Sequence, residues 1–226
     1  ILELHPDLKG EMINGSYIYR EGESLYQFYL TKYAGVDHES GEAQYWAKDT
    51  DGAEYKTSDW SAAYNTNRQA SGDLLPTIYG GIGTTLDFYG FDFSIQCAYQ
   101  LGGKIYDSGY QALMHGGGSH DLGYNWHKDI LNAWTPENTN SDIPRIDAID
   151  KYTNSSSDRW LTSSDYFAIN NITLGYTLPQ RWLRNLGIGS LRVYGAADNV
   201  ALFSARRGLD PRMSYTTAST DRYTPI

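Results

Sequence analysis

The chain has 226 residues, with 18 Lys and Arg against 27 Asp and Glu, so its formal net charge is −9 at pH 7. This acidic balance, without a basic stripe to offset it, argues against nucleic-acid binding. The single cysteine, Cys97, excludes an intrachain disulfide, and no apolar stretch approaches the ~18 residues that a transmembrane helix needs.

Residues 1–77 are mostly polar and rich in turn-forming residues. Two short segments, 17–20 and 25–32, flank the turn sequence at 21–24 and predict a β-hairpin. The polar region 34–77 follows. Within it, Asp49, Asp51 and Gly52 lack the rest of a calcium-loop pattern, so a plain turn with Gly52 at positive φ is expected.

Residues 78–101 carry the strongest signal in the chain. Two strands of about 11 residues meet at Tyr89-Gly90, and folding the chain there fixes which residues lie opposite each other. One face is then apolar from end to end, with the pairs Phe88/Phe91, Leu86/Phe93, Thr84/Ile95, Ile82/Cys97 and Ile78/Leu101. The other face is polar, and Asp87 is expected to face Asp92 near the turn. Such a ribbon is typical of a transmembrane β-barrel with its apolar face toward lipid, although a soluble sandwich alternates in the same way with that face buried.

Residues 102–165 form a long segment in which only 127–134 suggests a helical turn. A loop of this length counts against a compact soluble domain, whereas long external loops are normal on outer-membrane barrels. The spacing of His115, His120 and His127 fits no structural metal site, and residues 116–118 lack the context of an oxyanion or phosphate loop. No metal, cofactor or catalytic residue is therefore expected.

Two more strands are predicted at 166–178 and 191–199, joined by a short connector in which Trp182 is expected to be an interfacial anchor. Their alternation again gives one apolar and one polar edge. Long and short connections therefore alternate along the chain, as they do around a barrel wall with long loops outside and short periplasmic turns.

At this point the sequence resembles the C-terminal part of the SusC/RagA-like TonB-dependent outer-membrane transporters of Bacteroidetes. The matching stretches follow one another over nearly the whole chain: 22–29 (GESLYQFY), 33–37 (YAGVD), 75–81 (LPTIYGG), 89–92 (YGFD), 134–140 (WTPENTN), 143–145 (IPR), 165–167 (DYF), 171–176 (NITLGY), 193–195 (VYG), 198–199 (DN) and 208–211 (GLDP).

The resemblance implies an all-β fold, a segment of a large antiparallel transmembrane β-barrel that has 22 strands in the family. The N-terminal plug and the last strand would lie outside this chain, which is expected to be part of a longer protein. The family is not enzymatic: it imports oligosaccharides, and sometimes peptides, across the bacterial outer membrane. Its partners are a SusD-like surface lipoprotein and the TonB complex, which acts through the absent N-terminal part.

The prediction divides the chain into five segments. These are an extracellular loop region with a hairpin (1–77), a transmembrane hairpin (78–101), a long extracellular loop (102–165), two transmembrane strands with a short periplasmic connector (166–199) and an extracellular loop (200–226). Whether 17–32 spans the membrane stays open, and an external hairpin is favoured because it keeps the up-and-down order of the strands.

Three groups of site residues are expected. The lipid-facing group is Phe91, Phe93, Ile95, Ile172, Leu174 and Tyr176. The lumen-facing group is Asp92, Gln96, Asn171, Thr173 and Arg192. Trp46, Trp60, Trp126 and Trp134 are substrate-binding candidates because flat aromatic rings stack on sugars, with loop packing as the alternative role for each.

Two other functions stay open. A soluble cell-surface glycan-binding β-domain would bury Phe91, Phe93 and Ile95 against a second sheet. A secreted hydrolase would need paired carboxylates in a cleft, and no such pair stands out.

Overall fold

The computed structural model describes residues 1, 3–118, 121 and 123–213, and these form two compact units. Unit 1 comprises Ile1–Leu75 and Lys104–Thr162, and unit 2 comprises Pro76–Gly103 and 163–213. The sheets in both units are antiparallel and the helices are few and short, which confirms the all-β class. Among the described residues the strands do not close into a barrel.

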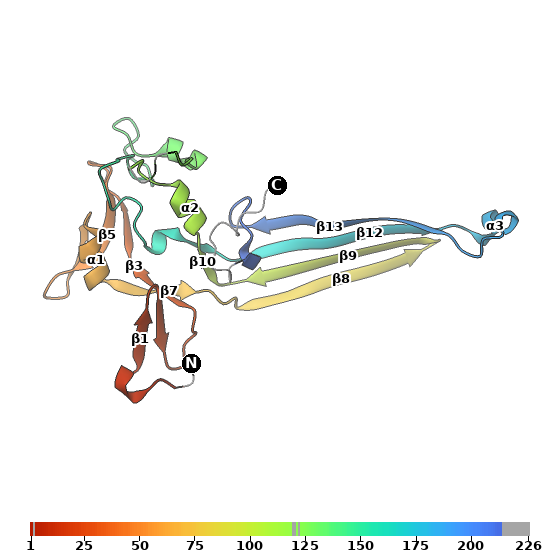
Figure 1. Ribbon diagram of the computed structural model, residues 1–226, viewed down its shortest axis with the longest axis horizontal. Helices are drawn as coiled ribbons and strands as arrows, with labels where there is room; N and C mark the ends of the chain where they lie inside the picture. The colour runs from red at the N-terminus through yellow and green to blue at the C-terminus, as the bar shows by residue number, and fades with distance from the viewer. Residues whose placement is uncertain (2, 119–120, 122, 214–226) are drawn as a thin grey trace. The chain divides into compact units, whose positions relative to one another are not determined.

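Unit 2 is a four-stranded sheet in the order β13-β12-β9-β8 (Figure 1). Its strands are β8 (Ile78–Phe88), β9 (Phe91–Leu101), β12 (Tyr166–Thr177) and β13 (Arg192–Ser204). The predicted hairpin register is confirmed pair by pair, from Phe88 opposite Phe91 to Ile78 opposite Leu101. The long segment between β9 and β12 leaves and re-enters this sheet at the end opposite the β8–β9 turn, and the connector between β12 and β13 lies at the turn end.

The turn between β8 and β9 is as short as a hairpin allows. Tyr89 and Gly90 are its two residues, and both have positive φ, at 48° and 89°. Two positive-φ residues are what the two-residue turn matching the right-handed strand twist requires. This turn therefore fixes the hairpin register.

Paired irregularities in β12 and β13 keep the apolar side chains on one face. In β12 the register shifts between Ile169 and Asn171, so that Ile169 lies opposite Cys97 while Ile172 lies opposite Ile95. Without the extra residue, positions 169 and 172 would point to opposite faces. In β13, Asn199 adopts a φ of 52° at the corresponding shift.

β13 continues to Ser204, beyond the strand end expected at residue 199. The bulge interrupts the apolar–polar alternation at Asn199 and Val200. For this reason the sequence predicted a loop from residue 200. The connector between β12 and β13 contains α3 (Gln180–Leu183) and the 3₁₀ turn η5 (Arg184–Leu186), and η6 (Pro211–Met213) follows β13. Residues 214–226 of the last predicted segment lie outside the described residues.

Unit 1 holds more regular structure than its polar sequence suggests. Four of its strands form one sheet, β1 (Glu11–Asn14), β2 (Tyr17–Arg20), β3 (Gln27–Thr31) and β7 (Arg68–Asp73). A second sheet contains β4 (Tyr33–Val36), β5 (Ala43–Lys48) and β6 (Glu54–Thr57). The predicted hairpin is present as the β2–β3 pair.

The segment expected as a long loop, 102–165, is folded as well. It contains β10 (Lys104–Tyr106), α2 (Ser108–Leu113), η3 (Lys128–Asn132), η4 (Asp158–Trp160) and β11 (Leu161–Ser163), and β10 pairs with β11. η3 confirms the predicted helical turn. Trp160 is 2% exposed and packs with Met114 and Ile130 in a small core.

A second small core lies under α1 (Trp60–Thr66), which packs on β5. Tyr45, Ala47 and Ala63 are buried there, and Trp60 packs against them. Asp59 caps α1 by accepting hydrogen bonds from the backbone of Ser61 and Ala62. None of the helices in the described part of the chain is long and apolar enough to cross a membrane.

Candidate functional site

The β8–β13 sheet places all six predicted lipid-facing residues on one face. Because directly opposed residues share a face, the rows can be followed across the strands. Phe91 lies opposite Tyr176, Phe93 opposite Leu174, and Ile95 opposite Ile172. Phe91 is 41% and Leu174 53% exposed, and no second sheet of unit 2 covers them among the described residues. The burial that a soluble sandwich requires is therefore absent from the described part of unit 2.

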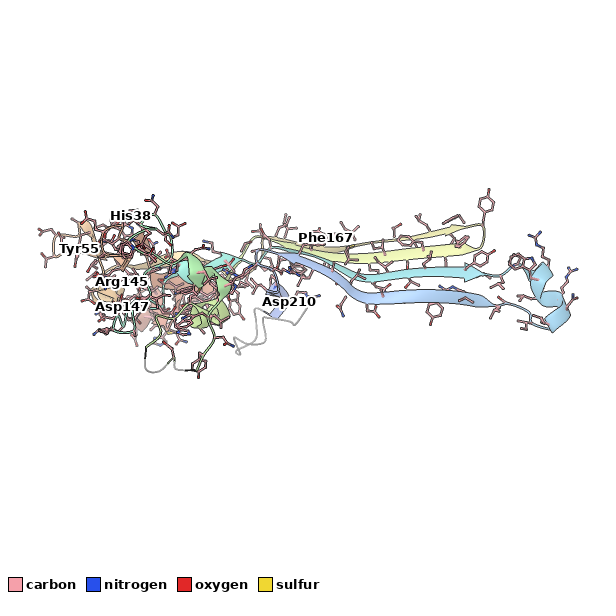
Figure 2. All side chains as sticks on the ribbon, turned by 90° about the horizontal axis from the view of Figure 1, so that it is seen from above. His38, Tyr55, Arg145, Asp147, Phe167 and Asp210 are labelled. Atoms are coloured by element: carbon pink, nitrogen blue, oxygen red, sulfur yellow. The ribbon has the colours of Figure 1, made fainter. Side chains whose placement is uncertain are left out.

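Aromatic rings gather at both ends of this apolar face. At the turn end, the Phe91 ring lies 5.7 Å from that of Phe88 and 4.5 Å from that of Tyr176, between ring centroids. At the other end, Phe167 and Phe203 are 6.5 Å apart, and Tyr99 lies opposite Phe167. The side chains of these strands are drawn in Figure 2, which labels Phe167. Two aromatic belts that flank an aliphatic band are typical of membrane-crossing strands.

The strand lengths fit the same interpretation. The four strands have 11, 11, 12 and 13 residues. A tilted strand needs about 9–11 residues to cross the hydrocarbon core of a bilayer. Each strand of the sheet is thus long enough to cross.

The opposite face carries all five predicted lumen-facing residues and a hydrogen-bond network. Asn171 donates through Nδ2 to Asp198 Oδ1 at 2.7 Å, and Thr173 donates to Asn171 Oδ1 at 3.1 Å. Gln96 lies opposite Asn171 in the same row. Polar groups that satisfy one another across strands suit a surface in contact with water or with another polar surface.

A bidentate ion pair that the sequence did not reveal crosses this polar face. Arg192 donates through Nε and Nη2 to the two carboxylate oxygens of Asp92, at 2.8 and 2.5 Å. The pair passes over Gly175, which lies opposite Asp92. A Cβ atom on Gly175 would lie 2.5 Å from both carboxylate oxygens, so a larger residue there would displace the ion pair. Asp87 does face Asp92 as predicted, and Arg192 balances that charge.

The four candidate tryptophans all lie in unit 1, but in different surroundings. Trp60 donates its Nε1–H to the Ser156 carbonyl at 2.7 Å, and Trp134 donates to the His38 carbonyl at 3.1 Å. The Trp134 ring also covers Gly41, where no Cβ atom would fit. These contacts make Trp60 and Trp134 packing residues of the loops.

Trp46 is half-buried beneath two lysines, and Trp126 is the exposed one of the four, although it too donates its Nε1–H to a carbonyl, that of His115, at 2.9 Å. The ammonium groups of Lys32 and Lys56 each lie 5.4 Å from the Trp46 ring centroid. Trp126 is 47% exposed and stacks on His115, with 5.0 Å between the ring centroids. No ring contact joins any two of the four tryptophans in the described ranges, so their role in substrate binding stays a prediction.

The Asp49 turn is present as predicted, and two of the three histidines can be described. Asp49 accepts hydrogen bonds from the backbone of Asp51 and Ala53, and Gly52 has a φ of 83°. His115 is 3% exposed, and His127 caps η3. His120 lies outside the described residues, and within those residues no group of three His, Cys, Asp or Glu could hold a metal ion.

Arg145 joins two distant parts of unit 1. It donates to the Ser40 carbonyl at 2.7 Å, to Glu42 at 3.2 Å and to Asp147 at 2.9 Å. The backbone N–H of Ile149, together with Arg145, holds the pKa of the Asp147 carboxyl below its usual range. Figure 2 labels Arg145 and Asp147. This cluster fixes the part of the 102–165 segment around residues 145–147 onto the 40–42 turn.

No family model matches the chain. The chain is 30% identical over 211 residues to TonB-dependent receptor P3 of Formosa agariphila, covering 91% of this chain and 20% of that protein. It is 24% identical over 143 residues to TonB-dependent receptor P26 of the same organism, covering 63% of this chain and 14% of that protein.

Among solved structures, one described as the RagAB peptide transporter matches with a TM-score of 0.70 and 28% identity, covering 88% of this chain and 22% of that chain. The RagAB peptide importer in its "closed-closed" state matches with a TM-score of 0.71 and 27% identity, covering 89% of this chain and 22% of that chain. The chain spans about a fifth of the length of the relatives that it matches.

Proposed function

We propose that this chain, a segment of a SusC/RagA-like TonB-dependent transporter, supplies four strands to the wall of an outer-membrane importer. The apolar face of the β8–β13 sheet would meet lipid, and the polar face with the Asp92–Arg192 pair would line the lumen. The family resemblance found in the sequence is confirmed by the receptors and RagAB structures described above. They also support the outer-membrane location.

One observation carries the proposal. The sheet has a continuous apolar face that no second layer of unit 2 covers in the described residues, bounded at each end by aromatic rings. In water such a face would be a large exposed apolar patch, which soluble monomers rarely tolerate. In a bilayer it is the expected surface of a strand wall.

The direction of the strands suggests the topology. The Tyr89-Gly90 turn and the connector with α3 lie at one end of the sheet and are short, so we assign this end to the periplasm. Trp182, 57% exposed next to Arg181, would then sit at the periplasmic boundary as an interfacial anchor. The segments 1–77 and 102–165 would be extracellular and would contribute to the substrate vestibule.

The cargo is proposed to be a large nutrient that needs energised uptake. Oligosaccharides are the first candidate because Trp126 offers an exposed ring on which a sugar could stack. Peptides are the second candidate, since the solved relatives are described as peptide importers. A SusD-like surface lipoprotein and the TonB complex, reached through the N-terminal part of the whole protein, are the proposed partners. No catalytic residue is proposed.

The test uses neighbouring positions that point to opposite faces. Phe93→Cys and Ser94→Cys are made separately in the full-length protein after Cys97→Ala, and each new thiol carries a nitroxide label. In membranes, molecular oxygen, which concentrates in lipid, should relax the label at 93, and a water-soluble nickel chelate should relax the label at 94. A label at 93 that neither oxygen nor the nickel chelate reaches would contradict the membrane wall and favour the soluble glycan-binding domain, which buries Phe93. Equal access of the nickel chelate to both labels would also contradict the membrane wall.

Cargo is tested separately. Cells that lack the full-length gene are complemented with it, and uptake of labelled oligosaccharide and labelled peptide mixtures is compared. Uptake of peptides alone would overturn the first candidate and leave the barrel proposal intact.

A further inference from the structure

The apolar face of the β8–β13 sheet is hollowed near the end where the chain leaves the sheet. The hollow has a volume of about 640 Å³, a size typical of small-molecule sites. Tyr99, Phe167 and Phe203 form its aromatic part, and it extends to Ile82, two residue pairs further from this end. It therefore runs from one aromatic belt toward the middle of the strands.

A glycine makes room for the Tyr99 side chain, which lines the hollow. Gly80 lies opposite Tyr99 on the apolar face and presents no side chain there. A Cβ atom at Gly80 would lie 3.0 Å from the Tyr99 hydroxyl, so the tyrosine leans across the space that a larger residue would fill. Three rows nearer to the β8–β9 turn, the corresponding positions on the same face are Leu86, Phe93 and Leu174.

The rim of the hollow is polar at one end only. Ser163, Asp165 and Ser204 lie on that rim, and one carboxylate oxygen of Asp165 accepts a hydrogen bond from the Gly102 backbone at 2.6 Å, which directs that oxygen toward the backbone. Two residues beyond Ala205, which also lines the hollow, Arg207 is exposed and has no hydrogen bond or ion pair with another described residue. The site is thus apolar inside, polar at its mouth and positively charged beside it.

We propose that this hollow holds one acyl chain of a phosphate-bearing lipid of the surrounding membrane, with the lipid phosphate at Arg207. The inference rests on the proposed function, which turns this face toward the bilayer. Transfer of a chain from other lipid chains into the hollow gains no hydrophobic free energy, because both surroundings are apolar. Retention therefore depends on packing against the fixed rings and on the charge contact, and both can be removed by substitution.

The experiment measures lipid retained by the full-length transporter. The protein is purified from outer membranes in a mild detergent, and native mass spectrometry counts phosphate-bearing lipid per molecule. Ala205→Trp fills the hollow, while Ala197→Trp adds the same side chain to the same face of the sheet, opposite Ile172 and outside the hollow. Arg207→Gln removes the charge at the mouth, and Arg184→Gln removes an exposed charge at the other end of the sheet.

Wild type, Ala197→Trp and Arg184→Gln should each retain about one lipid. Ala205→Trp should lower retention at least fivefold, and Arg207→Gln severalfold, more at low than at high salt. Equal retention by Ala205→Trp and Ala197→Trp would overturn the binding of an acyl chain in the hollow. Unchanged retention by Arg207→Gln would overturn the contact between Arg207 and the lipid phosphate. Wild type that carries detergent only, with a lower melting temperature in Ala205→Trp, would mean that the protein itself covers the hollow.

The label experiment at Phe93 and Ser94 keeps the two proposals apart. If the label at 93 is in lipid and the hollow retains none, the lipid seat fails while the barrel wall stands. If the label at 93 is in water, both proposals fail.

Discussion

Ile172→Arg should strongly destabilise the folded protein in a membrane, whereas Thr173→Arg should not. Ile172 lies opposite Ile95, which is the fifth of the 11 residues of β9, so both lie within one residue of the middle of the strand. An arginine on the lipid face at mid-bilayer costs about 2–4 kcal/mol. Since 1.4 kcal/mol is a factor of ten, the ratio of folded to unfolded protein should fall roughly 30- to 700-fold.

Thr173 is the next residue along β12 and points to the polar face, where its hydroxyl bonds Asn171. An arginine there keeps its head in water, so the expected change is within about 0.5 kcal/mol. The measurement is the urea-dependent folding equilibrium of the full-length protein in lipid vesicles, followed by the heat-modifiable shift of folded protein on gels. Similar losses for both variants, or a larger loss for Thr173→Arg, would refute the assignment of the two faces.

Three further predictions follow from other contacts. Gly175→Val should separate Arg192 from Asp92, because its side chain enters the space between them, and should destabilise the folded protein in the same folding assay; in an Asp92→Asn, Arg192→Gln background that loss should shrink, and an undiminished loss would assign it to strand geometry alone. Trp126→Ala should weaken cargo binding by calorimetry, whereas Trp134→Ala should leave it unchanged and lower the melting temperature by uncovering Gly41; the reverse pattern in cargo binding would contradict their assignment. The lowered pKa of Asp147 predicts a local pH effect: a carboxyl with a depressed folded-state pKa adds stability that is complete above its unfolded pKa of about 3.9 and is lost as the pH falls through the folded value. The protection factor of the Ile149 amide, which is the exchange rate of an unstructured peptide at the same pH divided by that of this amide, should therefore fall over that acidic range, and it should already be low at neutral pH in Asp147→Asn; a pH-independent protection factor in the wild type would contradict the effect.

The sheet of unit 2 could be predicted from the sequence because its signals are local and periodic. Alternation over 11 residues and a two-residue turn determine the β8–β9 register without any distant contact. The end of β13 could not be predicted, because Asn199 takes a positive φ and breaks the alternation on which the prediction depends.

Unit 1 and the ion pair were missed for different reasons. The elements of unit 1 are short, and many of its turns are held by side chains that bond the backbone, as Asp59 and His127 do at the starts of α1 and η3, so no period emerges. The Asp92–Arg192 pair joins residues 100 positions apart. The pair can be predicted only once β9, β12 and β13 are known to be neighbours. Gly175, which lies opposite Asp92 and carries no side chain, would then have indicated that Asp92 and Arg192 can meet across β12.

The pairing of β10 with β11 bears on how the sheet assembles. β9 and β12 are neighbours in the sheet, yet residues 102–165 separate them along the chain. Drawing together two strands across so long an excursion is entropically costly and slow when the excursion is a random coil. The pairing of residues 104–106 with 161–163, together with the hydrogen bond from the Gly102 amide to Asp165, brings the ends of β9 and β12 together. The chain that must still be closed between the two strands is then only a few residues long. A transporter of this kind would then add β12 to the growing wall almost as readily as the second strand of a hairpin, provided that its outer excursion has collapsed first.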